Sequence, residues 1–386
     1  MSGQPHEEAD HHDTSDSDPN RDQDRNTDRN TDQDRDTDRD TDQDRDRHTD
    51  HGSGTPRRLL LTTTAAALAP LLAGVGATAA RAQAQDPAPA TMEGGGHAHA
   101  PVQPVTTTPA DWEQVARALG RRGFMAGDMA YNTHFPRRDL HVVSYGVPVS
   151  PELALGSHVA FVRYADGNVL AMGDLTVTEG ELHEVTDVLQ AHGIEQTALH
   201  KHLLAHSPDV WWTHVHAHGR DPVAIARGLR AALDRTAAPP DEPPRPPGPV
   251  DLDTGAIDAA LGMKGWQEGR VYKTTFARRE VVVDRGMALP RGLGTISAFI
   301  FQPLGGGRAA LNGDVVMVAE EVQDVIKILR HGGIGLVELH NHGLREEPRL
   351  FFIHLWAVGD AVGLARTLRK AVDATNVVGV ARGRGV

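Results

Sequence analysis

The sequence predicts an α+β protein that contains two tandem copies of one antiparallel-sheet domain, with helices on one face of each sheet and the two copies packed as a pseudo-twofold pair. The first observation is a set of short segments that recurs in the same order on both sides of a proline-rich stretch. The second is that strand-like segments outnumber helix-like ones in each copy, with frequent hairpin turns, which is typical of α+β folds. Matches in order across a whole unit indicate duplication.

The recurring segments occupy corresponding places in the two copies. They are Ala118-Leu119-Gly120 with Ala260-Leu261-Gly262, Phe135-x-Arg137-Arg138-Asp139 with Phe276-x-Arg278-Arg279-Glu280, Gly173-Asp174 with Gly313-Asp314, His200-Lys201-His202 with His340-Asn341-His342, and Pro208 and His214 with Pro348 and His354.

The strands of the first copy are expected at residues 140–145, 159–164, 169–172, 194–202 and 210–216. An Asp166-Gly167 turn joins the second and third of them as a hairpin.

Three helices are expected in each copy, and the first copy begins with one at residues 112–119. Thr178, followed three residues later by Glu181, forms a capping box that begins the second helix. Asp221-Pro222 begins the third, because proline is favoured at the first helical position.

Composition shifts divide the chain into six segments. These are a low-complexity leader (1–56), a signal peptide (57–84), a flexible linker (85–110), the first repeat (111–236), a proline-rich linker (237–250) and the second repeat (251–386).

The N-terminal segments predict export. The leader is rich in Asp, Arg and Thr and cannot bury apolar surface, so we expect it to be disordered. Arg57-Arg58, an apolar run and Ala82-Gln83-Ala84 form a twin-arginine signal with a cleavage site. The run is interrupted by threonines, glycines and a proline, so no stable membrane span is expected after cleavage. We therefore expect a periplasmic, cell-envelope or extracellular protein.

The composition excludes several classes of protein. The formal net charge of -13 argues against a nucleic-acid partner. The chain has no cysteine, which excludes disulfides, thiolate zinc sites, a cysteine nucleophile and an N-terminal lipid anchor on cysteine.

Histidines that recur in both copies are the candidate metal ligands. Residues two apart on a strand point to the same face, so each His-x-His pair projects together, and a third histidine follows at the same distance. Neutral imidazoles from neighbouring strands are typical ligands of zinc or another divalent metal. The predicted ligands are His200, His202 and His214 in the first copy and His340, His342 and His354 in the second.

Other histidines distinguish the two copies. His206, His216 and His218 are expected to be peripheral, and the second copy has Trp356 and Val358 where the first has the last two. Because the first copy is richer in histidine, with His134 and His141 as well, we expect it to hold the functional site and the second copy to be mainly structural.

Three kinds of charged residue are further candidates. Asp174 and Asp314 could accept a hydrogen bond from a ligating histidine. Arg137 and Arg138, with their counterparts Arg278 and Arg279, could bind an anion or form a solvated strand entry. Glu195 is the candidate general base, although its counterpart is Gly335.

The chain has two copies of a Leu-His-x-His motif, and Gly-Asp and a helix precede each copy. With these motifs, residues 112–375 resemble the LppY/LpqO family of bacterial exported proteins. That resemblance implies a tandem domain of unknown function. A looser similarity is to acetolactate decarboxylase, which holds zinc with His-x-His and a third histidine, and it would place His200, His202 and His214 at the metal.

Three functions remain open from the sequence. The protein could bind a divalent metal without catalysis, or be a metal-dependent lyase or hydrolase acting on a small carboxylate, or be an envelope-associated binding module without metal. The expected partner is an unidentified small molecule or envelope component, and the sequence does not decide whether the protein is an enzyme.

Overall fold

The structure, a computed structural model, describes residues 100–242 and 248–380. The expected leader and signal peptide lie outside the described residues. Within the described ranges, no helix is long and apolar enough to cross a membrane.

The first repeat folds into an antiparallel sheet with the strand order β1-β2-β5-β6-β9-β7. The long central strands β5, β6 and β9 pair without interruption, and β7, which carries the His-x-His motif, forms one edge. The bounds are β1 Phe124–Ala126, β2 Ala130–Pro136, β5 Gly156–Arg163, β6 Val169–Thr178, β7 Glu195–His200 and β9 Val210–Gly219.

The second repeat repeats this topology in the order β10-β11-β14-β15-β17-β16, with β18 paired to β11. Its His-x-His strand, β16, is again an edge strand beside β17. The bounds are β10 Trp266–Glu268, β11 Val271–Arg278, β14 Ile296–Gly305, β15 Arg308–Met317, β16 Gly335–His340, β17 Phe351–Asp360 and β18 Val377–Gly379. The expected α+β fold of two tandem antiparallel-sheet domains is confirmed.

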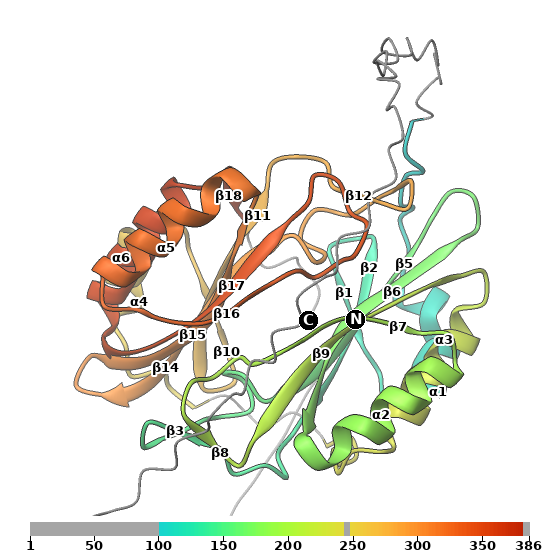
Figure 1. Cartoon of the computed structure of the whole chain (residues 1–386), viewed down its shortest axis with the longest axis horizontal. Coiled ribbons are helices and arrows are strands. Elements are labelled where there is room, and N and C mark those ends of the chain that lie inside the picture. Colours follow the sequence, from blue (N-terminus) through green and yellow to red (C-terminus); the bar gives the residue numbers. More distant parts are fainter. Residues whose placement is uncertain (1–99, 243–247, 381–386) are drawn as a thin grey trace, which may run out of the picture. The chain divides into compact units, whose positions relative to one another are not determined.

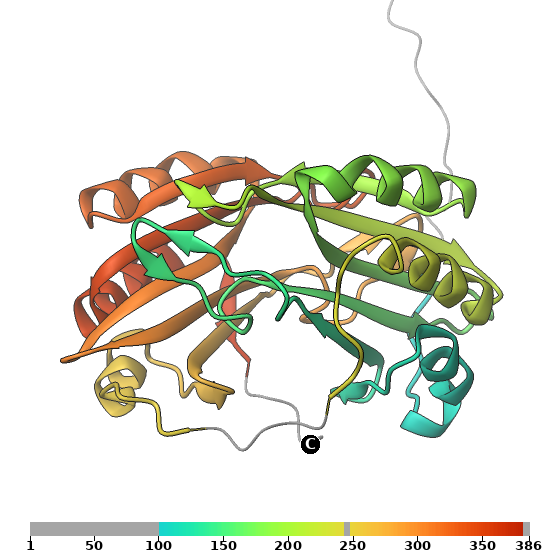
Figure 2. The same ribbon diagram turned by 90° about the horizontal axis from the view of Figure 1, so that it is seen from below.

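Helices cover the outer face of each sheet (Figure 1, Figure 2). One apolar core lies between the first sheet and its helices, and an equivalent core lies in the second repeat. The helices are η1 Pro109–Trp112, α1 Glu113–Leu119, α2 Glu179–Ala191 and α3 Pro222–Leu233 in the first repeat, and α4 Thr254–Leu261, η2 Ala319–Glu321, α5 Val322–His331 and α6 Ala361–Asp373 in the second.

The helix starts follow the sequence signals. Thr178 is the N-cap of α2, and its backbone N–H donates to Glu181 at 2.8 Å, as a capping box requires. The Asp221 carboxylate accepts hydrogen bonds from the backbone N–H groups of Val223 and Ala224 at the start of α3.

The two sheets join through their inner faces, where two further apolar clusters contain residues of both repeats. One includes Trp212 and Val149 of the first repeat with Trp356 and Val271 of the second. In the other, Met172 packs with the second-repeat residues Met287 and Leu293. Each repeat thus buries apolar surface that it would expose alone.

Short hairpins extend from each repeat toward the other. In the first repeat, β3 Val143–Ser144 pairs with β4 Val147–Pro148 and with β8 His206–Ser207. In the second, β12 Val283–Asp284 pairs with β13 Met287–Ala288.

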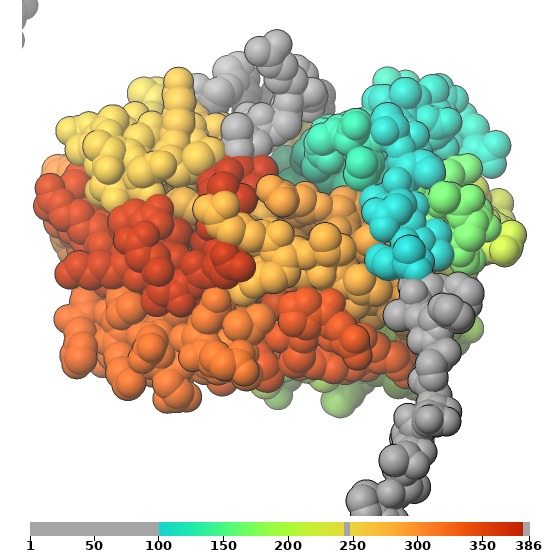
Figure 3. Space-filling view, turned by 90° about the horizontal axis from the view of Figure 1, so that it is seen from above, coloured from blue at the N-terminus to red at the C-terminus, as the bar shows by residue number. Residues whose placement is uncertain are grey.

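The described part of the expected flexible linker, residues 100–110, is held in place. Val102 bridges Met287 of the second repeat, and Val105 donates a hydrogen bond to the carbonyl of Arg163. Figure 3 shows this segment, in cyan, beside the hairpin of the second repeat, in light orange. Its backbone groups find partners in both repeats, so this part differs from the flexible linker expected.

The recurring arginines of the Phe-x-Arg motif bind carboxylates of their own repeat. The Arg137 side chain is 1% exposed and contacts Asp139 at 2.8 Å and Glu181 at 2.9 Å. Arg278 pairs in the same way with Glu280 and Glu321. Both arginines therefore tie the start of a helix to a sheet and are not free to bind an external anion.

We expect Arg137→Ala to destabilise the protein by about 3 kcal/mol, because removal of one partner from a buried ion pair leaves the other uncompensated. Chemical denaturation followed by tryptophan fluorescence measures the change. Arg138→Ala is the matched control: its side chain is 36% exposed and 3.7 Å from Glu242, so a change below about 0.5 kcal/mol is expected. Equal effects of the two substitutions would contradict the structural role of Arg137.

Candidate metal centre

The two His-x-His motifs meet at the interface between the repeats. Each motif begins at the last residue of its edge strand, β7 or β16, and continues into a loop. Hydrogen bonds across the interface fix both loops: Thr197 Oγ1 donates to the carbonyl of His342, and Asn312 Nδ2 donates to the carbonyl of His202, both at 2.6 Å.

All six predicted ligands converge there with pseudo-twofold symmetry. The His200 and His340 rings stack on each other at 4.1 Å between centroids, at the centre of the cluster. On either side of this stack lies a pair of histidines, and the two pairs have nearly equal separations. The ring centroids of His202 and His354 are 3.9 Å apart, and those of their counterparts His342 and His214 are 4.1 Å apart.

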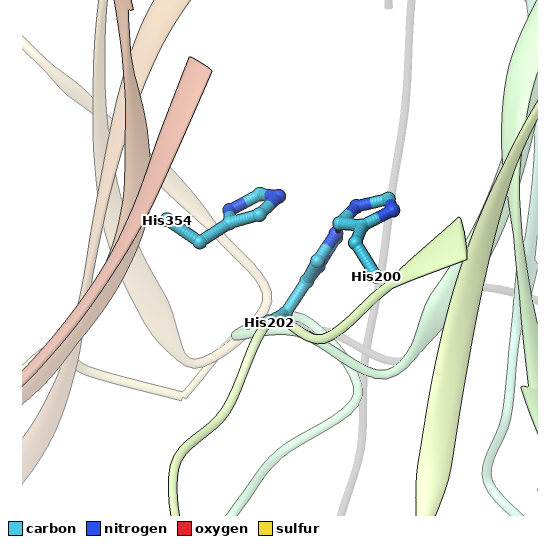
Figure 4. A group of neighbouring side chains, drawn as sticks. All are labelled: His200, His202 and His354. Carbon is cyan, nitrogen blue, oxygen red and sulfur yellow. Dashed lines mark hydrogen bonds between the residues drawn. The ribbon is translucent and has the colours of Figure 1, made fainter. Parts of the chain in front are cut away.

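Ring nitrogens from both repeats come close enough to share an ion. His200, His202 and His354 each offer a nitrogen within 4.8 Å of the others, and Figure 4 shows His200 and His202 beside His354 from the facing strand. A second group consists of His200, His214 and His340. Buried histidine and aspartate groups of this protein could therefore hold a metal ion.

The nitrogen separations match those of metal ligands. His200 Nε2 and His202 Nε2 are 2.9 Å apart, and His214 Nε2 and His340 Nε2 are 3.4 Å apart. Two nitrogens bound to a tetrahedral zinc at about 2.0–2.1 Å lie about 3.3 Å from each other. An ion would thus fit after only small movements of the rings.

The third histidine of each repeat is oriented by a glycine carbonyl. His214 Nδ1 lies 3.4 Å from the carbonyl oxygen of Gly173, and His354 Nδ1 lies 3.2 Å from that of Gly313. Donation from Nδ1 leaves the Nε2 lone pair for a ligand. A Cβ at Gly173 would lie 2.1 Å from the carbonyl oxygen of His158, so the Gly-Asp motif needs glycine for close strand approach.

The aspartates of the Gly-Asp motifs reach the same cluster. Asp174 Oδ2 lies 3.1 Å from His202 Nε2, and Asp314 Oδ2 lies 3.8 Å from His342 Nε2. Burial raises the pKa of both carboxyl groups, that of Asp314 to about 7. Asp174 is thus within hydrogen-bond distance of His202, whereas Asp314 is too far from His342 for a hydrogen bond, so only the first repeat has the geometry of the expected acceptor.

The cluster holds its imidazoles in the neutral form that binds metals. Burial lowers the pKa of all six rings, and the pKa of His214 falls to about 3. Several ring nitrogens also lack any hydrogen-bond partner although they are buried, which is costly in the absence of a ligand. They are His200 Nδ1, His340 Nδ1, His342 Nε2 and His354 Nε2.

The repeats share the site. The sequence predicts three ligands from each repeat and a functional site in the first repeat. In the described residues, each three-histidine group instead combines both repeats, because the edge strands β7 and β16 face each other across the interface. The second repeat therefore contributes to the site and is not only a structural partner.

A row of polar side chains crosses the inner face of the first sheet toward this cluster. The register aligns His134, His158, Asp174 and His214 on four adjacent strands, whereas the second sheet has Thr275 and Ala298 before Asp314. Loss of hydration lowers the pKa of His134 and of His158 to about 4, although both side chains retain exposed surface. The outer end of this row therefore reaches the surface of the protein.

The other predicted residues lie elsewhere. Glu195 is 40% exposed and pairs with Arg285 and Arg345, so it does not serve the cluster as a general base. His206 binds the backbone of Leu203 and Val210.

His216 and His218 were expected to be peripheral, but they converge with Asp284 of the second repeat in a further group. The sequence signal was present in part, because both histidines lack counterparts in the second copy.

Comparison with known proteins identifies the family. A family model described as Domain of Unknown Function (DUF1259) matches residues 113–235 and 255–374. The chain belongs to this family. The two matched ranges are the two repeats of the structure, and they contain all six histidines of the central cluster. No curated protein matches the chain.

Similar solved structures share very little with this DUF1259 protein. A double-ringed trimeric shell protein of the RMM microcompartment has 13% identity over 63% of this chain and 93% of its own, with a TM-score of 0.16. The trimeric bacterial microcompartment shell protein PduB has 12% identity over 67% and 95%, with a TM-score of 0.17. Neither likeness informs the site.

Proposed function

We propose that this DUF1259 protein is an exported divalent-metal-binding protein whose central cluster holds zinc or a similar ion between its repeats. The proposal assigns one ion to His200, His202 and His354 and a second to the pseudo-equivalent His340, His342 and His214. The observation that carries it is the convergence of buried, neutral imidazoles from both repeats, with ring nitrogens of His200, His202 and His354 within 4.8 Å of one another. The second assignment follows from the pseudo-twofold symmetry of the cluster, in which the His214 and His342 rings lie 4.1 Å apart between centroids. Imidazole ligands favour zinc, copper, nickel or iron over magnesium or calcium.

Export through the twin-arginine route and membership of an LppY/LpqO-like group belong to the same proposal. Paired arginines, an apolar run and an A-x-A site support the export route. That route carries folded proteins, and a metal bound before export would arrive in place. Cell fractionation of the full chain, with and without Arg57→Lys/Arg58→Lys, tests the route.

Metal analysis of protein purified without an affinity tag tests the central proposal. We expect about two equivalents of a transition metal at the six-histidine cluster and a rise of about 10 °C in the unfolding temperature when zinc is restored to metal-free protein. His200→Ala/His340→Ala should lose both ions, because each triad contains one of these residues.

His183→Ala/His331→Ala is the matched control, since both side chains are exposed on helices α2 and α5. Less than about 0.1 equivalent of metal, with no thermal shift on adding zinc, would exclude the metal function and leave an envelope-associated binding module.

One observation favours catalysis as a second candidate. Three imidazoles leave a coordination position open on a tetrahedral ion, and His134 and His158 extend the polar row from Asp174 to solvent. Lys273 lies close enough to lower the pKa of both histidines and could hold a small carboxylate. Lysis or hydrolysis of such a substrate should fall with Lys273→Met while the bound metal stays. Unchanged turnover in that variant would exclude this arrangement.

A further inference from the structure

We propose that His216, His218 and Asp284 form a separate metal site, in which two imidazoles and one carboxylate hold a divalent first-row ion and leave other positions open. One ligand atom of each residue lies within 4.8 Å of the other two. None of the three belongs to the six-histidine cluster. The site therefore stands whether or not that cluster binds metal.

The fold brings these residues together from both repeats. His216 and His218 are two residues apart on β9 and so share its inner face, while Asp284 ends the short strand β12 of the second repeat. Asp284 Oδ2 lies 3.2 Å from His218 Nε2 and 3.8 Å from His216 Nδ1. Ligands bound at about 2.1 Å and at right angles or wider lie about 3.0–3.5 Å apart, so an ion needs adjustments of a few tenths of an ångström.

Several polar atoms at this site are buried and make no hydrogen bond. Asp284 is 3% exposed and His216 is 4% exposed. Asp284 Oδ2, His216 Nε2 and both ring nitrogens of His218 are buried without a hydrogen bond. Their spacing around Asp284 Oδ2 is also that of an ion pair. A divalent ion bound among these atoms would in addition satisfy the buried nitrogens that make no hydrogen bond.

The two repeats differ at all three positions together. The pseudo-equivalent place has Trp356 and Val358 in the strand, and Ser144 in the hairpin position that Asp284 occupies. There Trp356 packs in an apolar cluster, and the Ser144 hydroxyl donates to the carbonyl of Leu204. One side of the interface thus has every ligand and the other has none. If the two histidines had no common ligand, nothing would link their presence in one repeat to an aspartate at the facing position of the other.

The site has room for a further ligand. A cavity of about 10 Å³ has His216, Asp284, His342 and Glu346 among its lining residues. This volume holds about one water molecule, which could occupy an open position of the ion. Two imidazoles and one carboxylate with open positions are typical of iron(II) and also suit zinc.

Cobalt(II) titration of metal-free full-length protein tests the site, because the ion suits imidazole and carboxylate and its visible absorption reports coordination. We expect Asp284→Asn to bind about one equivalent less than the wild type while it retains the ions of the six-histidine cluster. His200→Ala/His340→Ala, which lacks the ligands of that cluster, should still bind about one equivalent. Adding Asp284→Asn to this variant should abolish binding.

Two further variants keep the outcome decisive. Ser144→Ala, at the pseudo-equivalent position, should leave the number of bound ions unchanged. His218→Gln, at a half-buried position, should reproduce the loss if Asp284→Asn folds poorly. The proposal is overturned if His200→Ala/His340→Ala binds no cobalt, or if both ligand variants bind as much as the wild type.

Discussion

Replacing His354 with alanine should remove the same ion as replacing His202 with alanine, although the two residues belong to different repeats. Their ring centroids are 3.9 Å apart, and both group with His200. A tetrahedral ion that loses one of three imidazoles loses most of its affinity. Each single variant should therefore lose about one of two equivalents, and His202→Ala/His354→Ala should lose no more, since residues of one site are not additive.

Pairs of substitutions within one repeat should behave differently. His202→Ala/His214→Ala affects both proposed triads, because the His214 ring lies 4.1 Å from His342. It should lose about two equivalents when metal is measured by mass spectrometry of the dialysed protein. The opposite pattern, with His202 and His214 non-additive and His202 and His354 additive, would mean that each repeat binds its own ion. Loss of all metal in every single variant would mean one shared ion.

The sequence could predict the ligands but not how they combine. Alternation on a strand expected at residues 194–202 predicted that His200 and His202 project together, although β7 ends at His200 and His202 lies in the following loop. The third histidine recurs at a fixed distance in both copies. That spacing is the same whether the third ligand comes from the same repeat or the other one. The choice depends on how the edge strands β7 and β16 meet, which involves contacts between residues far apart in the sequence.

Strand β2 shows a similar limit in the fold. A strand was expected at residues 140–145, where the structure has only the short strand β3, and the strand Ala130–Pro136 was not expected. The outer face of β2 carries Tyr131 and Phe135 toward the helices, but its inner face carries Asn132 and His134 toward the polar interface. Short polar and proline-containing strands give a weak apolar pattern.

The sequence did not predict Asp284 as a site residue, because the spacing between the arginine motif and the following hairpin differs by one residue between the repeats. The hairpins β3–β4 and β12–β13 have equivalent turns at Tyr145-Gly146 and Arg285-Gly286. The first turn lies one residue further from its arginine motif than the second does. The available signal was that Asp284 of the second repeat has no equivalent aspartate in the first, and that His216 and His218 of the first repeat have no equivalent histidines in the second. It becomes meaningful only once the hairpin is seen to reach across the interface.

Metal-free protein should unfold sharply as the pH falls from about 6.5 to 4. Burial holds the pKa of the six clustered imidazoles below the ordinary value of about 6.5, so in this range the unfolded chain binds more protons than the folded one. Stability is then complete above about pH 6.5 and is lost as the pH decreases. Asp174 and Asp314 act in the opposite direction, because their raised pKa lets the folded protein retain protons.

The six imidazoles outnumber the two carboxyl groups that act in the opposite direction, so the net effect is a loss of stability as the pH falls. Circular dichroism during acid titration in chelator should therefore show a steep midpoint between about pH 4 and 6. Bound zinc should move the midpoint to lower pH, since ions and protons compete for the same nitrogens. His202→Phe/His342→Phe should titrate less steeply by about two protons. A midpoint below about pH 3.5 without metal would show that the rings are already hydrated, and the buried cluster would then not exist in solution.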